Sequence, residues 1–249
     1  SLTRGRLMYF GPADRDENLL LAPPTMENRN MLGGHRLWLG PQATWLKGWP
    51  PPKEWEYSGP ESWTTDNGVL RMLAGDAGDG WPRLTRVYRW NGPSLVCGAE
   101  FSGGTRDAQF VQIFQMPAET AVSADASPEK EFPAGYVQLP STAGPFAAQF
   151  VPPPHVTRTA GSVILRHVNA VGKFGFRPQT LVGAAQHYVL KVSRGAQNGE
   201  VVSNPDQGFL TQVYLSGPDG RFIELEQLSP VFAAGRSASF DVTLAGAAR

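Results

Sequence analysis

Two glutamates placed two residues apart near the C-terminus are the most direct candidates for acid–base chemistry. Glu224 and Glu226 lie within residues 221–230, where polar and apolar residues alternate. On a β-strand they would share one face, about 6.5–7 Å apart. Two carboxylates on a buried face need cations, solvent or a ligand, and in a cleft one of them can acquire a raised pKa and act as a general base. The alternative is that both lie on the solvated outer face of an edge strand.

A second concentration of functional residue types is Gly-Gly-His-Arg-Leu-Trp-Leu-Gly-Pro-Gln at residues 33–42. The two glycines allow the backbone to turn sharply or to approach another strand. Strand alternation after them places His35 on one face and Arg36 and Trp38 on the other.

Five of the seven tryptophans follow within residues 38–63. One interpretation is a sugar site, because flat indole faces stack on the C–H surface of a pyranose while arginine and histidine bond its hydroxyls. The other is a loop held over a sheet edge by Trp and Pro packing. If a sugar binds here, the residues expected to contact it are Arg36, Trp38, Gln42, Trp45 and Trp49.

Motifs for metals and phosphates are absent from the sequence. It has no phosphate-binding Gly-Lys-Ser/Thr loop, no His-Glu-x-x-His, no Cys-x-x-Cys and no Gly-x-Ser-x-Gly. The four histidines are scattered, without the i, i+2 spacing that puts two imidazoles on one strand face. The acidic turns at 14–17 and 76–79 could bind Ca²⁺, or could be solvated loops. We therefore expect no metal site and no cofactor.

Bulk composition narrows the class of protein and its partners. The chain of 249 residues has 22 basic and 22 acidic side chains and a pI near 6.9, which argues against nucleic-acid binding. No apolar run is long enough to span a membrane. The single cysteine, Cys97, is expected to be a buried small hydrophobe. The compartment stays open between the cytoplasm and the periplasm after signal removal, since the chain begins at Ser1 and could be truncated or processed. The oligomeric state also stays open.

The elements that must position these residues are short strands. Gly and Pro, 28 and 22 residues, punctuate β-type runs, and no window of eleven residues has helical periodicity. We predict one all-β domain over residues 1–249, a large antiparallel sandwich, with a surface loop at 118–132 and at most a short helix at 178–185. The strands are expected at 6–10, 35–39, 69–73, 84–90, 94–101, 110–116, 135–139, 147–151, 162–169, 187–193, 211–216, 222–228 and 237–244.

Several short stretches together resemble the galactose mutarotase-like (aldose 1-epimerase-like) superfamily, in particular its members with a Gly-Gly-His-Arg-Leu-Trp motif. The resemblance covers most of the chain in layout. The stretches that carry it are Arg-Gly-Arg-Leu at 4–7, Glu-Asn-Leu-Leu at 17–20, the motif at 33–38, Glu-Leu-Glu at 224–226 and Ser-Pro at 229–230. At 234–236, Ala-Gly-Arg replaces the family's Pro-Gly-Glu-like turn.

The resemblance implies a supersandwich whose concave face binds carbohydrate and opens the pyranose ring without cofactor or metal. It assigns the base to Glu226 or its neighbour Glu224, and a sugar-ligand role to His35. The family's acid is a mid-chain histidine, for which we select His187, although neither it nor the other two mid-chain histidines has the family's Asn-x-x-His-Gly context. Catalysis by such a set requires Glu226, His35 and one mid-chain histidine to converge on one cleft.

Three functions follow as hypotheses. The first is a mutarotase- or epimerase-type enzyme acting on a small sugar or oligosaccharide. The second is a non-catalytic carbohydrate-binding module on the same face. The third is a polysaccharide lyase or hydrolase built on a related sandwich.

Overall fold

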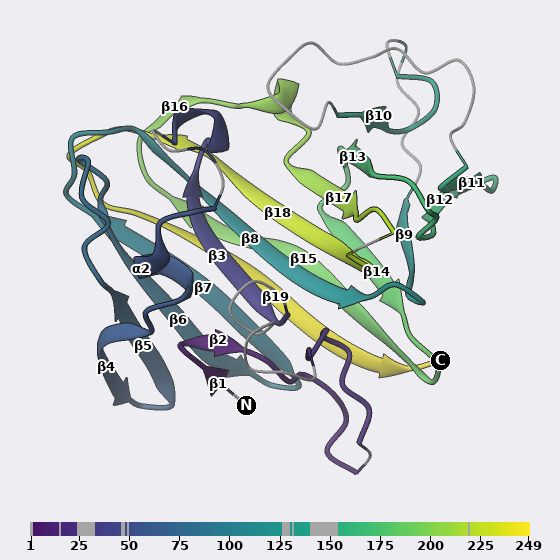
Figure 1. Cartoon of the computed structure of the whole chain (residues 1–249), viewed down its shortest axis with the longest axis horizontal. Helices are drawn as coiled ribbons and strands as arrows, with labels where there is room; N and C mark the ends of the chain where they lie inside the picture. Colours follow the sequence, from purple (N-terminus) through teal and green to yellow (C-terminus); the bar gives the residue numbers. More distant parts are fainter. Residues whose placement is uncertain are drawn as a thin grey trace.

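Two large antiparallel sheets pack face to face in the computed structural model (Figure 1), which describes residues 2–14, 16–23, 33–45, 48, 50–125, 130, 132–139, 154–218 and 220–249. The predicted all-β sandwich is confirmed. Within the described residues its helical elements are single turns: η1 (Gln42–Thr44), α2 (Lys53–Glu56) and η2 (Asp206–Gly208).

The first sheet has seven strands. Its path runs in the order β10 (Val137–Gln138), β13 (Gly172–Phe176), β17 (Thr211–Leu215), β18 (Phe222–Phe232), β8 (Ala108–Pro117) and β3 (His35–Gly40), and β16 (Val201–Ser203) pairs with β18. The strand with the two glutamates, β18, therefore lies inside the sheet, between β17 and β8.

The second sheet has ten strands, and a short hairpin of β1 (Leu2–Thr3) and β2 (Arg6–Leu7) stands apart from both sheets. The ten strands run in the order β11 (Val156–Arg158), β12 (Ser162–Leu165), β9 (Ala121–Asp125), β14 (Thr180–Ala184), β15 (Tyr188–Asn198), β19 (Ala238–Ala248), β7 (Ser94–Ser102), β6 (Arg83–Asn91), β5 (Val69–Ala74) and β4 (Pro60–Asp66).

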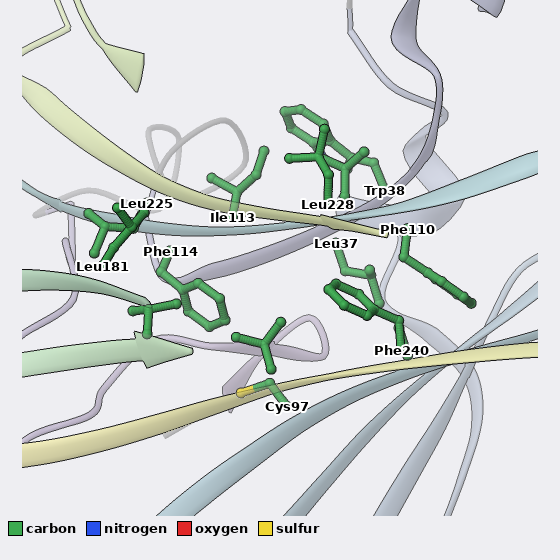
Figure 2. Close-up of a cluster of buried hydrophobic side chains, with 14 of the residues drawn as sticks. Leu37, Trp38, Cys97, Phe110, Ile113, Phe114, Leu181, Leu225, Leu228 and Phe240 are labelled. Atoms are coloured by element: carbon green, nitrogen blue, oxygen red, sulfur yellow. The ribbon is translucent and has the colours of Figure 1, made fainter. Parts of the chain in front are cut away.

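The core fills the space between the sheets because one residue in two along each strand is apolar and points inward. Figure 2 shows Phe110 and Phe114 of the seven-stranded sheet pointing toward Phe240 and Cys97 of the other, and all four are fully buried. Trp38 points away from that core, to the opposite side of its sheet. The expectation of a buried Cys97 is confirmed, and burial raises the pKa of its thiol well above the usual range.

The outer edge of β3 is closed by an arginine from the other sheet. Arg86 of β6 donates to the carbonyl oxygens of Leu37 at 3.3 Å and of Trp55 at 2.8 Å, and approaches that of His35 at 3.5 Å. Because unpaired edge carbonyls are costly when buried, one buried guanidinium here satisfies several of them at once. Arg86 thereby fixes β3, the strand that carries Arg36, to the second sheet.

Two local predictions are wrong. The surface loop expected at 118–132 contains β9, an interior strand of the ten-stranded sheet in which Val122 and Ala124 are buried. The short helix expected at 178–185 is β14, with Leu181 buried at the same period of two. Both segments alternate between buried and partly exposed residues, as a strand does, but each strand has only five residues, too few to be recognised without the strands that pair with it. The strand expected at 147–151 lies outside the described residues.

Candidate functional site

Charged and polar side chains gather on the side of the seven-stranded sheet that faces away from the core. Directly opposed residues of neighbouring strands share a face, so the register defines its rows. One row contains Gln115, Glu224, Tyr214 and Lys173, on β8, β18, β17 and β13. The adjacent row contains Arg36, Ile113, Glu226 and Gln212. We call this surface the charged face.

Glu224 and Glu226 share the charged face, as their spacing predicts, but they are not solvated. Glu224 is 7% exposed and Glu226 is 3% exposed. The alternative of a solvated edge strand is therefore wrong, because β18 has strands on both sides and its carboxylates are covered.

Glu226 is held in an ion pair. The ammonium of Lys173 lies 2.9 Å from its Oε2. Burial lowers the pKa of Lys173, but the attraction of Glu226 outweighs it and the pKa is raised above its usual value. The pair thus gives Glu226 a charge-assisted hydrogen bond within the sheet.

Glu224 has a different environment. Its Oε1 accepts a hydrogen bond of 2.6 Å from Nε2 of Gln115 and lies 3.8 Å from Nη1 of Arg36. Burial, followed by repulsion from Glu226, raises the pKa of Glu224 to about 7, against the opposing effects of Arg36 and Gln115. The two glutamates thus have different nearest partners, a cation for Glu226 and a neutral amide for Glu224, a pattern typical of acid–base sites.

Arg36 is committed mainly to a third carboxylate. Its Nε lies 2.9 Å from Oε2 of Glu56, at the end of α2, and its Nη2 lies 2.9 Å from the same oxygen. Burial lowers the pKa of Arg36, but the attraction of Glu56 and Glu224 outweighs this effect, and the pKa is raised above its usual value. Arg6 adds a second buried guanidinium, 3.7 Å from Glu56. Arg36 therefore links the glutamate pair to the segment that packs against β3.

The two glycines serve the site through packing. Both have positive φ, and a Cβ on Gly34 would lie 2.2 Å from the carbonyl oxygen of Leu7. The N–H of Gly33 donates to Oε1 of Gln115. Because that backbone group can only donate, it turns the amide of Gln115 so that Nε2 faces Glu224. The predicted close approach of backbone at this motif is confirmed, and its consequence is a fixed donor beside Glu224.

The predicted histidines do not join the glutamates. His35 is fully buried on the core side, with its ring stacked on Phe114 at 4.5 Å and Nδ1 3.0 Å from the hydroxyl of Tyr88. Burial, with the nearby Arg86, lowers the pKa of His35 well below its usual value. The prediction that His35 and Arg36 lie on opposite faces of the strand is confirmed, but the face that carries His35 is the one that packs in the core.

His187 lies in the bend directly before β15 of the ten-stranded sheet. Its Nδ1 is 3.0 Å from Oε2 of Glu17, and its side chain is half exposed. The remaining two histidines are also engaged elsewhere, His155 with the carbonyl oxygen of Ala170 and His167 with the hydroxyl of Ser216. The convergence that a histidine-based mechanism requires is therefore not found.

Four of the seven tryptophans form a packed chain rather than an open platform, whereas Trp63 on β4 is largely exposed. Trp38 and Trp45 meet edge to face at 5.6 Å, Trp45 meets Trp55 at 6.4 Å, and Trp55 meets Trp81 at 5.3 Å. All four are buried, which matches the interpretation of a loop held by Trp packing. Trp38 has a direct link to the charged face, since the guanidinium of Arg36 lies 4.7 Å from its ring centre.

Two predicted sugar contacts remain outside this cluster. Gln42 is exposed in η1, which follows the C-terminal end of β3, whereas Arg36 lies near the start of that strand. Trp49 lies outside the described residues.

Three residues around the glutamates were not predicted from the sequence. They are Lys173 and Gln115 on the charged face, and Glu56 on α2. A lone lysine in the short strand 172–176 and a glutamine in 108–117 look like ordinary strand residues. Only the pairing of β13, β17, β18 and β8 brings the first two to the glutamates.

A shallow cavity of about 290 Å³ lies on the outer face of the ten-stranded sheet and contains none of the predicted site residues. Its polar lining includes Arg83, Thr85, Glu100, Asn198 and Ser239. The carboxylate in this cavity, Glu100, is partly exposed and bonded to Arg71, unlike the two buried carboxylates of β18.

Two other kinds of site are absent from the described part of the chain. No three His, Cys, Asp or Glu side chains there are grouped so that they could hold a metal ion. No helix there has the length and apolarity to cross a membrane.

Comparisons with known proteins agree with this architecture. No family model matches the sequence, and no curated protein matches it either. Among solved structures, a protein provisionally called an aldose 1-epimerase (b2544) from Escherichia coli K12 superposes with a TM-score of 0.51 at 12% identity, over 75% of this chain and 69% of that one.

Two other structures cover more of the chain. HI1317 matches with a TM-score of 0.54 at 13% identity, over 98% of this chain and 86% of its own. Slr1438 from Synechocystis sp. PCC 6803 matches with a TM-score of 0.54 at 12% identity, over 94% and 86%. The chain therefore has a galactose mutarotase-like fold. At these identities the likeness shows the fold alone, since one fold hosts many functions.

Proposed function

We propose that the protein is a carbohydrate-active protein of mutarotase or epimerase type, which binds an aldose on the charged face and opens its ring by acid–base chemistry. One observation carries the proposal. Two buried glutamates share a face of an interior strand in a mutarotase-like sandwich, one paired with Lys173 and the other with a pKa raised to about 7.

Ring opening requires only proton transfers and positioning. A base removes the proton of the anomeric hydroxyl while an acid protonates the ring oxygen. Glu226 is our candidate base, because it has the closer cation of the two glutamates, Lys173 at 2.9 Å from Oε2. Arg36 and Trp38 border the two glutamates and are the candidate sugar contacts.

Exchange NMR on the anomers of D-glucose and D-galactose tests this function. We expect faster anomer exchange than in buffer, and a loss of at least about 100-fold in Glu226→Gln. Glu100→Gln, the same change on the outer face of the other sheet, should keep the rate. No acceleration of any aldose, or full activity of Glu226→Gln, would contradict the proposal.

The second candidate is a non-catalytic carbohydrate-binding module. The position of the four histidines favours it, because none contacts Glu224 or Glu226 in the described part of the chain. Calorimetry separates the two functions: sugar binding that depends on Lys173, without anomer exchange, supports the module.

A further inference from the structure

We propose that Glu224 is the proton donor of this site, so that a carboxylic acid and a carboxylate on one strand, rather than a histidine and a glutamate, share the acid–base work. This inference rests on the proposed function and assigns the acid that it lacks.

The spacing of Glu224 and Glu226 on β18 suits proton transfer to one oxygen of a sugar and from another. Residues i and i+2 of a strand point to the same side, with Cα atoms about 6.5–7 Å apart. Paired carboxyl groups that act on opposite sides of a sugar's anomeric centre in glycosidases are separated by about 5–9.5 Å. Glutamate side chains that leave one face at this Cα spacing can place their carboxyl groups within that range, and so can reach the two oxygens of one anomeric carbon.

The partners of the two side chains differ in the way the two roles require. Glu226 receives a full positive charge, Lys173, at 2.9 Å on Oε2. Glu224 receives a neutral amide, Gln115, at 2.6 Å, while its cation, Arg36, is 3.8 Å away and already bound to Glu56. The negative charge of Glu226 favours the neutral form of Glu224, whose own cation is farther away.

The contacts of Glu224 also leave one oxygen available. Gln115 and Arg36 both approach Oε1. Within the described part of the chain, Oε2 has no hydrogen-bond or ion-pair partner, so it is the atom that can carry the proton and deliver it. Glu226 has the same asymmetry: Lys173 occupies Oε2, which leaves Oε1 to accept a proton.

The charged and titratable groups around Glu224 come from five elements. They are Glu226 on its own strand, Arg36 on β3, Tyr214 on β17, Lys173 on β13, and Glu56 on α2, which acts through Arg36. Burial and Glu226 raise the pKa of Glu224, while Arg36, Gln115 and Lys173 lower it, and the balance is about 7. Glu224 is thus about half protonated at neutrality and holds its proton below it.

The proton transfers balance without another reactant. The Glu226 carboxylate takes the proton of the anomeric hydroxyl, and the O–H electron pair forms the aldehyde C=O. The bond from C1 to the ring oxygen breaks, and that oxygen takes the proton of Glu224. After rotation about C1–C2, Glu224 takes the proton back as the ring oxygen attacks the other face of C1, and Glu226 returns its proton to the new anomeric hydroxyl.

Infrared spectroscopy with exchange NMR tests the assignment. The wild-type protein should show the C=O stretch of a protonated carboxyl that disappears as the pH rises through about 7. Glu224→Gln should lack this band, whereas Glu100→Gln should keep it. In Glu226→Gln the band should be lost at a lower pH, because the neighbouring negative charge has been removed.

Anomer exchange of D-glucose and D-galactose then assigns the role. Glu224→Gln should bind the sugar but lose at least about 100-fold in exchange rate, and wild-type exchange should fall as the pH rises through about 7. A band that persists in Glu224→Gln, or exchange retained in that variant, overturns this inference and leaves the proposed function intact. A wild-type protein that exchanges no aldose overturns both, whatever the infrared spectrum shows.

Discussion

Replacing Glu224 by glutamine should make the protein more stable at high pH than the wild type, because the variant lacks the buried Glu224 carboxyl, whose ionisation destabilises the native state. Glutamine keeps the size of the side chain and its contact with Gln115. The native state holds the proton of Glu224 up to about pH 7, whereas an unfolded glutamate releases it near pH 4.5. Between these values the native state binds more protons, so the stability of the wild type falls as the pH rises.

The size of the effect follows from the interval between the two pKa values. From 4.5 to about 7, at about 1.4 kcal/mol per pH unit, the wild type loses about 3 kcal/mol of unfolding free energy that the variant does not lose. Glu224 is only 7% exposed, so solvent screening reduces this little. The contribution is fully present below about pH 4.5 and is lost by about pH 8.

Urea unfolding followed by tryptophan fluorescence measures this difference. The free energy of unfolding of Glu224→Gln minus that of the wild type should increase by about 3 kcal/mol between pH 4.5 and pH 8. The same difference for Glu100→Gln should stay within about 1 kcal/mol, because that carboxylate is solvated. A difference for Glu224→Gln that is independent of pH, or that decreases, would refute the reasoning.

Three further predictions concern the scaffold and are read from the same urea titrations. Gly34→Ala should destabilise the protein by about 1–3 kcal/mol or more, since φ is +69° and the new Cβ would lie 2.2 Å from the carbonyl oxygen of Leu7; a neutral result would contradict the packing role of the motif. Phe110→Ala should cost about 3–5 kcal/mol, because the ring is fully buried between the sheets; a loss below 1 kcal/mol would count against the described core. Asp241→Asn should cost less than about 1 kcal/mol, because its ion pair with Arg89 is partly exposed; a larger loss would show that this surface is more buried than described.

The fold could be predicted from the sequence because its signals are local. Alternation along single strands, with Gly and Pro between them, was enough to expect a large antiparallel sandwich. The same alternation put Glu224 and Glu226 on one face and separated His35 from Arg36. These relations depend only on the period of a strand.

The environment of the site could not be predicted because it depends on pairing between distant segments. Whether the two glutamates were solvated or covered depended on β17 and β8 enclosing β18. Lys173 is 53 residues from Glu226 and reaches it only through the order β13, β17, β18. His35 was expected at a sugar site because no local signal distinguishes the interior face of β3 from its outer face.

The central claim is that the charged face is the carbohydrate site, and a crystal structure of the protein soaked in D-galactose tests it most directly. We expect density for one sugar on the seven-stranded sheet, within hydrogen-bonding distance of Glu224 and Glu226, and none in crystals of a Lys173→Met variant that retains the wild-type fold. Sugar bound instead in the shallow cavity of the ten-stranded sheet, or no sugar bound at saturating concentration, would contradict the account.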